Sequence, residues 1–144
     1  MNKFGVSPAI ERQYGGIQFR SKAEARYAKW LDVRCRAQNS DIVSWRYEPL
    51  RFDLRCGTCT VAHYTPDFEV TLVGGSKEWH ECKGVNTPLG ALKIKMFRAC
   101  YPNEVLRVID ATSMKERPTG RATKDLRMKT RIVVRRGARL PVGP

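Results

Sequence analysis

The amino-acid sequence predicts an α/β fold in which helices flank a mixed central β-sheet. Three observations predict it: a helical apolar periodicity after Ser21, several strand-like segments between residues 42 and 83, and a second helical segment followed by a short apolar strand. The length of 144 residues suits one domain. We expect a loose N-terminal arm (1–18), a folded core (19–113) and a basic C-terminal extension (114–144).

The first helix has a clear start signal. Ser21 is followed three residues later by Glu24, which is the spacing of a capping box. Behind it, apolar residues recur every three or four positions and form one stripe: Ala23, Tyr27, Trp30, Leu31 and Cys35. The pattern predicts an amphipathic helix of about four turns that ends near Asn39-Ser40.

The remaining elements follow from composition and turn residues. Residues 42–54 are rich in β-branched and aromatic side chains, with Pro49 as the point where the strand would break. Further strands are expected at Thr60–Tyr64, Asp67–Val73 and Lys77–Lys83, with turns at Gly57-Thr58 and at Gly74-Gly75-Ser76. A helix is expected at 88–101 and a buried strand at 105–109.

The charge is strongly positive. Lys and Arg number 27 against 14 Asp and Glu, so the net charge is +13. Such an excess favours a polyanionic partner, above all nucleic acid, because bound phosphates release their counterions. We expect no membrane association, since no apolar stretch reaches the roughly 20 residues of a membrane helix and no basic amphipathic helix is evident. The N-terminal residues lack a signal-peptide pattern, which predicts an intracellular protein.

The five cysteines are expected to be free thiols. Cys56 and Cys59 form a CxxC pair that could be half of a zinc site, but a structural zinc site needs four ligands and the sequence has no second pair. Cys35, His63 and His80 could complete it only if the fold gathered them. We therefore favour a tight hairpin with Gly57-Thr58 at its tip over zinc binding.

Three polar residues point to chemistry. Asp67 follows Pro66 at the start of a predicted strand, and Glu81 and Lys83 stand two apart on the next strand. The period of two directs the Glu81 and Lys83 side chains to the same face of the sheet. A turn centred on Gly74-Gly75 brings Asp67 level with Glu81 to within a residue.

Such a set suits a hard divalent cation, which prefers oxygen ligands. Asp67, Glu81 and the backbone carbonyl of Cys82 could supply three oxygens to Mg²⁺, with Glu24 as a fourth acid and Mn²⁺ as a substitute. Lys83 could hold the attacking water and add positive charge at a phosphate. Each residue also has a structural interpretation: Glu24 as part of a capping box, Asp67 as a turn residue, and Glu81 with Lys83 as a solvated strand face.

The same residues carry a family likeness. Pro66-Asp67 and then Glu81-Cys82-Lys83 match the PD-(D/E)xK motif, and residues 19–24, 64–68 and 93–102 extend the match. Over roughly residues 17–110 the sequence resembles the phage endonuclease I-type Holliday junction resolvases and related small phage nucleases. The resemblance implies a restriction-endonuclease-like core, Mg²⁺-dependent hydrolysis of DNA, often at branch points, and a homodimer that presents two active sites.

By the motif, the metal-binding acids would be Glu24, Asp67 and Glu81, with Lys83 as the catalytic lysine. The basic residues expected to contact DNA are Arg20, Lys22, Lys93, Lys95, Arg131, Arg135, Arg136 and Arg139. If the chain is phage-encoded, it would act in the cytoplasm of a bacterial host. A nuclease of other specificity on the same fold, a non-catalytic basic nucleic-acid-binding protein and a zinc-stabilised binding module remain as alternatives.

Overall fold

The central sheet has four strands, and it is mixed as the sequence predicts. The computed structural model describes residues 5–117. Its strand order is β3-β6-β7-β8, with bounds Ile42–Tyr47, Phe68–Leu72, Lys77–Lys83 and Leu106–Asp110. β3, β6 and β7 are antiparallel neighbours, whereas β8 runs parallel to β7. The parallel step needs a crossover, and the helix α2 (Pro88–Cys100) supplies it.

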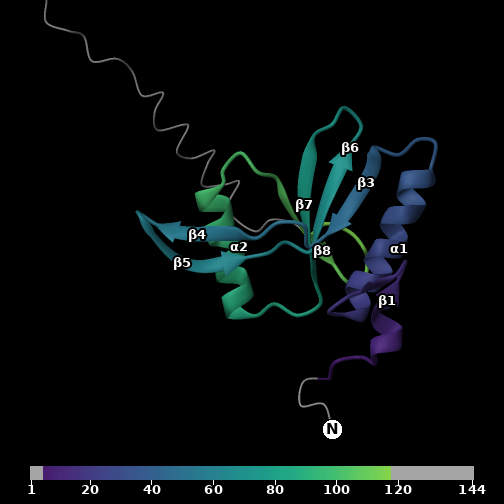
Figure 1. Cartoon of the computed structure of the whole chain (residues 1–144), viewed down its shortest axis with the longest axis horizontal. Coiled ribbons are helices and arrows are strands. Elements are labelled where there is room, and N and C mark those ends of the chain that lie inside the picture. Colours follow the sequence, from purple (N-terminus) through teal and green to yellow (C-terminus); the bar gives the residue numbers. More distant parts are fainter. Residues whose placement is uncertain (1–4, 118–144) are drawn as a thin grey trace, which may run out of the picture.

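Different elements cover the two faces of the sheet (Figure 1), and each face carries its own hydrophobic cluster. On one face, helix α1 (Lys22–Arg36) packs Tyr27 and Leu31 against Phe68 and Val70. On the other face lie α2 and a hairpin formed by β4 (Phe52–Cys56) and β5 (Cys59–Tyr64). There Phe52, Leu54 and Phe97 bury Trp79 and Leu106. Successive residues of β7 therefore point into different clusters.

Helix α1 begins where the sequence predicts. The Ser21 hydroxyl accepts a hydrogen bond from the Glu24 amide at 3.2 Å, which satisfies one of the free amides of the first turn. The helix ends at Arg36, a few residues before the predicted end, because Ala37 is already extended and its amide bonds to Arg34. The polar residues after it form a turn, with Ser40 donating to Ala37.

The N-terminal arm has more structure than expected. Within residues 5–18 the chain forms a 3-10 helix η1 (Ala9–Arg12) and a small hairpin of β1 (Gln13–Tyr14) and β2 (Ile17–Gln18). Strands of two residues are too short to show periodicity, which is why the pattern missed them. The Tyr14 hydroxyl donates to Asp32 at 2.7 Å and ties the hairpin to α1.

The predicted strand at 42–54 is broken at Pro49, and its two halves belong to different sheets. The Cys56 and Cys59 pair lies as the hairpin interpretation predicts, in cross-strand register with Gly57 at a positive φ of 59°. Among residues 5–117, no helix is long and apolar enough to cross a membrane. In the basic extension, the β-branched run Ile132-Val133-Val134 would predict a strand at 130–135, and this segment lies outside the described residues.

Candidate active site

Strands β6 and β7 bring the predicted acids together. Their register pairs Phe68 with His80, so Asp67 stands level with Glu81, as the turn at Gly74-Gly75 predicts. The Cys82 amide donates to Asp67 Oδ2 at 2.7 Å and fixes the carboxylate against the neighbouring strand. Both carboxylates are buried, with exposed fractions of 9% for Asp67 and 6% for Glu81. A solvated strand face is therefore excluded.

Glu81 and Lys83 lie on the same face of β7, as the period of two predicts. Lys83 Nζ stands 2.6 Å from Glu81 Oε1, and the Tyr64 hydroxyl donates to Glu81 Oε2 at 2.9 Å. The Lys83 side chain is only 21% exposed. The ammonium and the carboxylate are thus held in one place rather than free to sample solvent.

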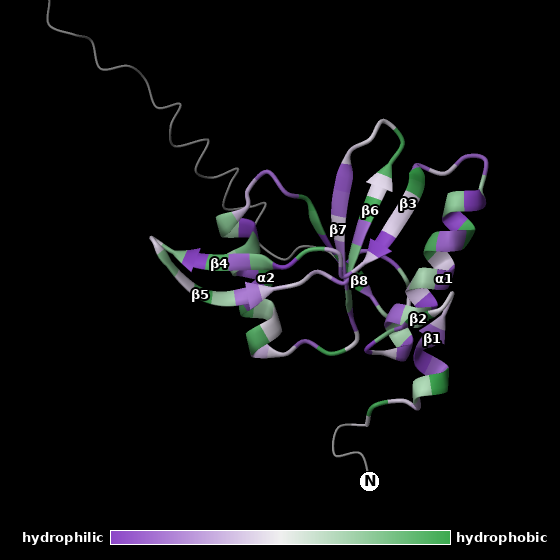
Figure 2. Ribbon diagram, viewed as in Figure 1, coloured by the Kyte–Doolittle hydropathy of each residue, from purple (hydrophilic) through white to green (hydrophobic). Residues whose placement is uncertain are grey.

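The composition of β7 is unusual for its position. It lies between two other strands of the sheet, yet it is hydrophilic over most of its length (Figure 2). Glu78, His80 and Glu81 are all buried in it. Ionisable side chains are rarely buried unless they are paired or functional. Each of these groups is therefore expected to be paired with a partner or to have a function, and the partners of each decide between the two.

Glu24 lies at the end of the sheet where β6 begins and β7 ends. Its carboxylate accepts hydrogen bonds from the Ser21 hydroxyl at 2.7 Å, the Tyr47 hydroxyl at 2.6 Å and the Arg20 amide at 3.2 Å. Ser21 and Glu24 therefore support each other at the helix start, which agrees with the capping interpretation. Glu24 also lies close enough to Asp67 for its negative charge to raise the pKa of Asp67. The capping role and the site role are compatible.

Asp67 has an adverse electrostatic environment. Burial raises its pKa well above the usual value, and the negative charges of Glu81 and Glu24 raise it further. The Cys82 amide and the Lys83 ammonium oppose this effect without cancelling it. Crowded buried acids of this kind are a recurrent feature of functional sites, because structure alone would favour a cation beside each of them.

The structure adds Glu48, which the sequence pattern did not indicate. Its φ of 42° is positive, a conformation that non-glycine residues seldom adopt. Its amide donates to the Asp67 carbonyl at 2.8 Å, and its carboxylate pairs with Arg20 at 3.0 Å. Burial raises the pKa of Glu48, and Glu24 and Glu81 contribute in the same direction. The sequence signal for Glu48 is weak: it is a glutamate that stands before Pro49 at the end of a predicted strand.

A family model matches residues 8–117, which is most of the chain. The chain belongs to the DUF1064 family, whose members are described as proteins of unknown function. No curated protein and no solved structure matches the chain. The match spans Glu24, Glu48, Asp67, Glu81 and Lys83, so the whole acidic cluster lies within the DUF1064 region.

The carboxylates of this DUF1064 member have the oxygen ligands that a hard cation prefers, but each of them is already bonded to a group of the protein. Among residues 5–117, no three His, Cys, Asp or Glu side chains converge as a ready-made metal site. Glu81 is bonded to Lys83 and Tyr64, and Asp67 to the Cys82 amide. The Cys82 carbonyl points to the same side of β7 as its amide, toward Asp67. A cation would therefore exchange these bonds for its own.

The predicted basic residues fall into three groups. Arg20 and Lys22 flank the start of α1 beside Glu24, and both are paired with acids, Glu48 and Glu11 respectively. Lys93 follows Gly90 by one helical turn on the same side of α2, whereas Lys95 is exposed on another side. The four predicted arginines of the C-terminal extension, Arg131, Arg135, Arg136 and Arg139, lie outside the described residues.

The C-terminal extension starts beside the site. The Arg117 guanidinium donates to the Lys83 carbonyl at 2.8 Å, to Asp110 at 3.0 Å and to Asn86 at 2.8 Å. The Lys83 carbonyl also accepts from the Ala111 amide. Arg117 is the last residue that the structure describes, so the described part of the chain ends next to Lys83.

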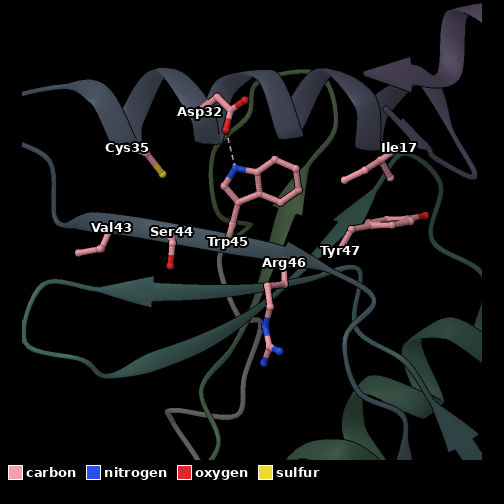
Figure 3. Close-up of a pocket in the computed structure, with 8 residues that line it drawn as sticks. All are labelled: Ile17, Asp32, Cys35, Val43, Ser44, Trp45, Arg46 and Tyr47. Atoms are coloured by element: carbon pink, nitrogen blue, oxygen red, sulfur yellow. Dashed lines mark hydrogen bonds between the residues drawn. The ribbon is translucent and has the colours of Figure 1, made fainter. Parts of the chain in front are cut away.

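A surface pocket elsewhere does not contain these groups. It lies between α1 and β3, where Asp32 accepts a hydrogen bond from the Trp45 indole at 2.8 Å (Figure 3). The same carboxylate group binds the Tyr14 hydroxyl, and this hydrogen bond lowers the pKa of Asp32. Asp32 is thus satisfied by two donors, unlike Asp67, and its role is structural.

Proposed function

We propose that this protein is a Mg²⁺-dependent DNA endonuclease with a PD-(D/E)xK active site on a restriction-endonuclease-like core. The observation that carries the proposal is the buried set of Asp67 and Glu81 on neighbouring strands, with Lys83 on the same face and Glu24 at the helix start. The order of these residues along the chain is that of the motif.

Asp67, Glu81, Glu24 and the Cys82 carbonyl would hold the cation, for which Mn²⁺ could substitute. When bound, the cation would polarise the scissile phosphate and activate a water for attack on it. It also relieves the repulsion among the acids. Lys83 would then lose its partner Glu81 to the cation, and its ammonium would be free to bind the scissile phosphate or the attacking water. Tyr64 and the Cys82 amide keep Glu81 and Asp67 in orientation.

DNA as the substrate is supported by charge. The net charge is +13, and Arg117, the last described residue of the basic extension, donates to the Lys83 carbonyl. Phosphates near the scissile bond would therefore meet a high density of arginine and lysine. We propose a preference for branched DNA and a homodimer with two sites, both of which rest on the resemblance to junction resolvases.

The test is incubation of the protein with a labelled four-way junction and with a linear duplex of the same sequence, in Mg²⁺ and in EDTA. Cleavage of the junction in Mg²⁺ alone is the expected result. Equal cleavage of both substrates would replace the branch preference by general nuclease activity. Binding without cleavage under all conditions would favour the non-catalytic nucleic-acid-binding alternative and reject the proposal.

A further inference from the structure

One glycine of α2 differs from the other glycines among residues 5–117. A Cβ built on Gly90 would stand 3.3 Å from Lys83 Nζ and 3.0 Å from Thr87 Oγ1, whereas a Cβ on any of the others would meet open space. The first turn of α2 therefore lies directly against the Lys83 ammonium. On its other side, the ammonium contacts Glu81 Oε1 at 2.6 Å.

The backbone does not require glycine at this position. Gly90 lies within the α-helix, where alanine is the more stable residue. It is the third residue after the cap Thr87, whose hydroxyl accepts from the Gly90 amide at 3.1 Å. A capping box would place Glu or Gln there. A glutamate at position 90 would offer Lys83 a second carboxylate and draw it from Glu81.

We propose that Gly90 is a positioning residue for Lys83: its lack of a side chain leaves the space that the Lys83 ammonium occupies against the first turn of α2. This inference rests on the proposed role of Lys83 in cleavage. An added methyl group would press on two side chains, Thr87 Oγ1 at 3.0 Å and Lys83 Nζ at 3.3 Å, and Lys83 Nζ is the far end of a flexible side chain that can move away. The added methyl group would lower the cleavage rate, because it displaces the Lys83 ammonium, and small displacements of a catalytic group slow a reaction strongly.

The experiment compares Gly90→Ala with Ala91→Gly, a neighbouring exposed position in the same turn. Gly90→Ala is expected to keep or raise the melting temperature, to bind the junction within a few-fold of wild type, and to lower the cleavage rate at saturating DNA by about tenfold or more. Ala91→Gly reverses the change in helix propensity and is expected to lower the melting temperature without changing the rate.

A second measurement does not depend on activity. The ¹³C shift of Lys83 Cε, assigned by its loss in Lys83→Met, is expected to move in Gly90→Ala and to stay in Ala91→Gly. Wild-type cleavage rates in a folded Gly90→Ala protein overturn the inference and leave the proposed function intact. If the wild type cleaves no DNA, the proposed function fails. In that case the Lys83 Cε shift still tests the contact between position 90 and Lys83, and an unmoved shift in Gly90→Ala overturns it. Failure of Gly90→Ala to fold also overturns the inference, because the lysine would not be the group that yields.

Discussion

Buried acids in and next to the central sheet have two opposite kinds of environment. Glu78 receives two hydrogen bonds from Arg107, at 2.6 and 2.8 Å, and these lower its pKa. Burial raises the pKa of Glu69, but hydrogen bonds from Arg46 and Lys77 outweigh it and lower the value. Asp67 instead lies among other acids, and its pKa is raised.

The difference separates carboxylates stabilised by neighbouring cations from a carboxylate placed among other acids. The chain has a net charge of +13, and two of its arginines pair with these acids, Arg46 with Glu69 and Arg107 with Glu78. Asp67 is two residues from Glu69 on the same face of β6, yet it receives a backbone amide and two acidic neighbours. Like charges gathered in a low-dielectric site destabilise the fold, so their presence indicates a role that stability does not explain.

The largest expected effect is on cleavage. Asp67→Ala, Glu81→Ala and Lys83→Ala should each lower the cleavage rate by about 10³-fold or more, because these groups act on the transition state. Junction binding in the absence of metal should stay within a few-fold of wild type, since the basic surface supplies the affinity. Single-turnover assays and gel-shift titrations measure the two quantities separately.

Glu69→Gln is the matched control, because Glu69 is similarly buried and lies on β6 two residues after Asp67. It should lower the melting temperature, since Arg46 and Lys77 lose their charged partner, while the rate per folded molecule stays near wild type. Near-full activity in Glu81→Ala would show that the assignment of the site is wrong.

Glu24→Gln is expected to have the next largest effect. Gln can still accept from Tyr47 and the Arg20 amide through its oxygen, and its amide group can donate to the Ser21 hydroxyl. The fold and the helix start should therefore survive, with a melting temperature close to wild type. The cleavage rate should fall by about 10²-fold if the charge helps to hold the cation. A fully active Glu24→Gln enzyme would reduce Glu24 to its capping role.

The sequence predicted the relative placement of Asp67, Glu81 and Lys83 better than it predicted the residues around them. Asp67, Glu81 and Lys83 could be placed from a turn and a period of two, because both are local properties of one hairpin. The mixed sheet and both helices followed from apolar periodicity for the same reason.

What the sequence could not predict depends on contacts between distant segments. Glu48 reaches the site because Pro49 ends β3 and the chain turns away to the β4–β5 hairpin. The arginine partners of Glu69 and Glu78 come from β3 and β8, far from these acids along the chain. The β1–β2 hairpin is fixed by Tyr14 and Asp32, not by its own pattern. None of these pairings has a local signal.

The C-terminal extension should affect affinity far more than chemistry. Truncation after residue 129 removes Arg131, Arg135, Arg136 and Arg139. If all four bind phosphates, the slope of log affinity against log salt should fall by roughly 3 to 4 units. Turnover at saturating DNA and low salt should change little. The full-length chain with these four arginines changed to glutamine is the control, because it retains Ile132-Val133-Val134. An unchanged slope in both folded variants would remove the extension from the DNA-binding surface.

The smallest expected effect concerns stability without metal, and it has opposite signs at the two kinds of acid. A carboxyl group whose pKa is raised on folding stabilises the protein at low pH, below about 4, and loses that contribution as pH rises through its folded pKa. Asp67→Asn keeps an oxygen for the Cys82 amide and removes the charge, so it should raise the free energy of unfolding at pH 8 by about 1 kcal/mol.

This gain should shrink as pH falls, because wild-type Asp67 then becomes protonated and neutral as well. Glu78→Gln should instead lower the free energy of unfolding by about 1–3 kcal/mol at pH 8, because Arg107 loses a charged acceptor. Chemical denaturation in EDTA at pH 5 and pH 8 measures both changes. Added Mg²⁺ should stabilise the wild type more than Asp67→Asn. If Asp67→Asn destabilised the protein at pH 8 as Glu78→Gln does, Asp67 would be an ordinary structural acid, and the contrast between the two kinds of buried carboxylate would fail.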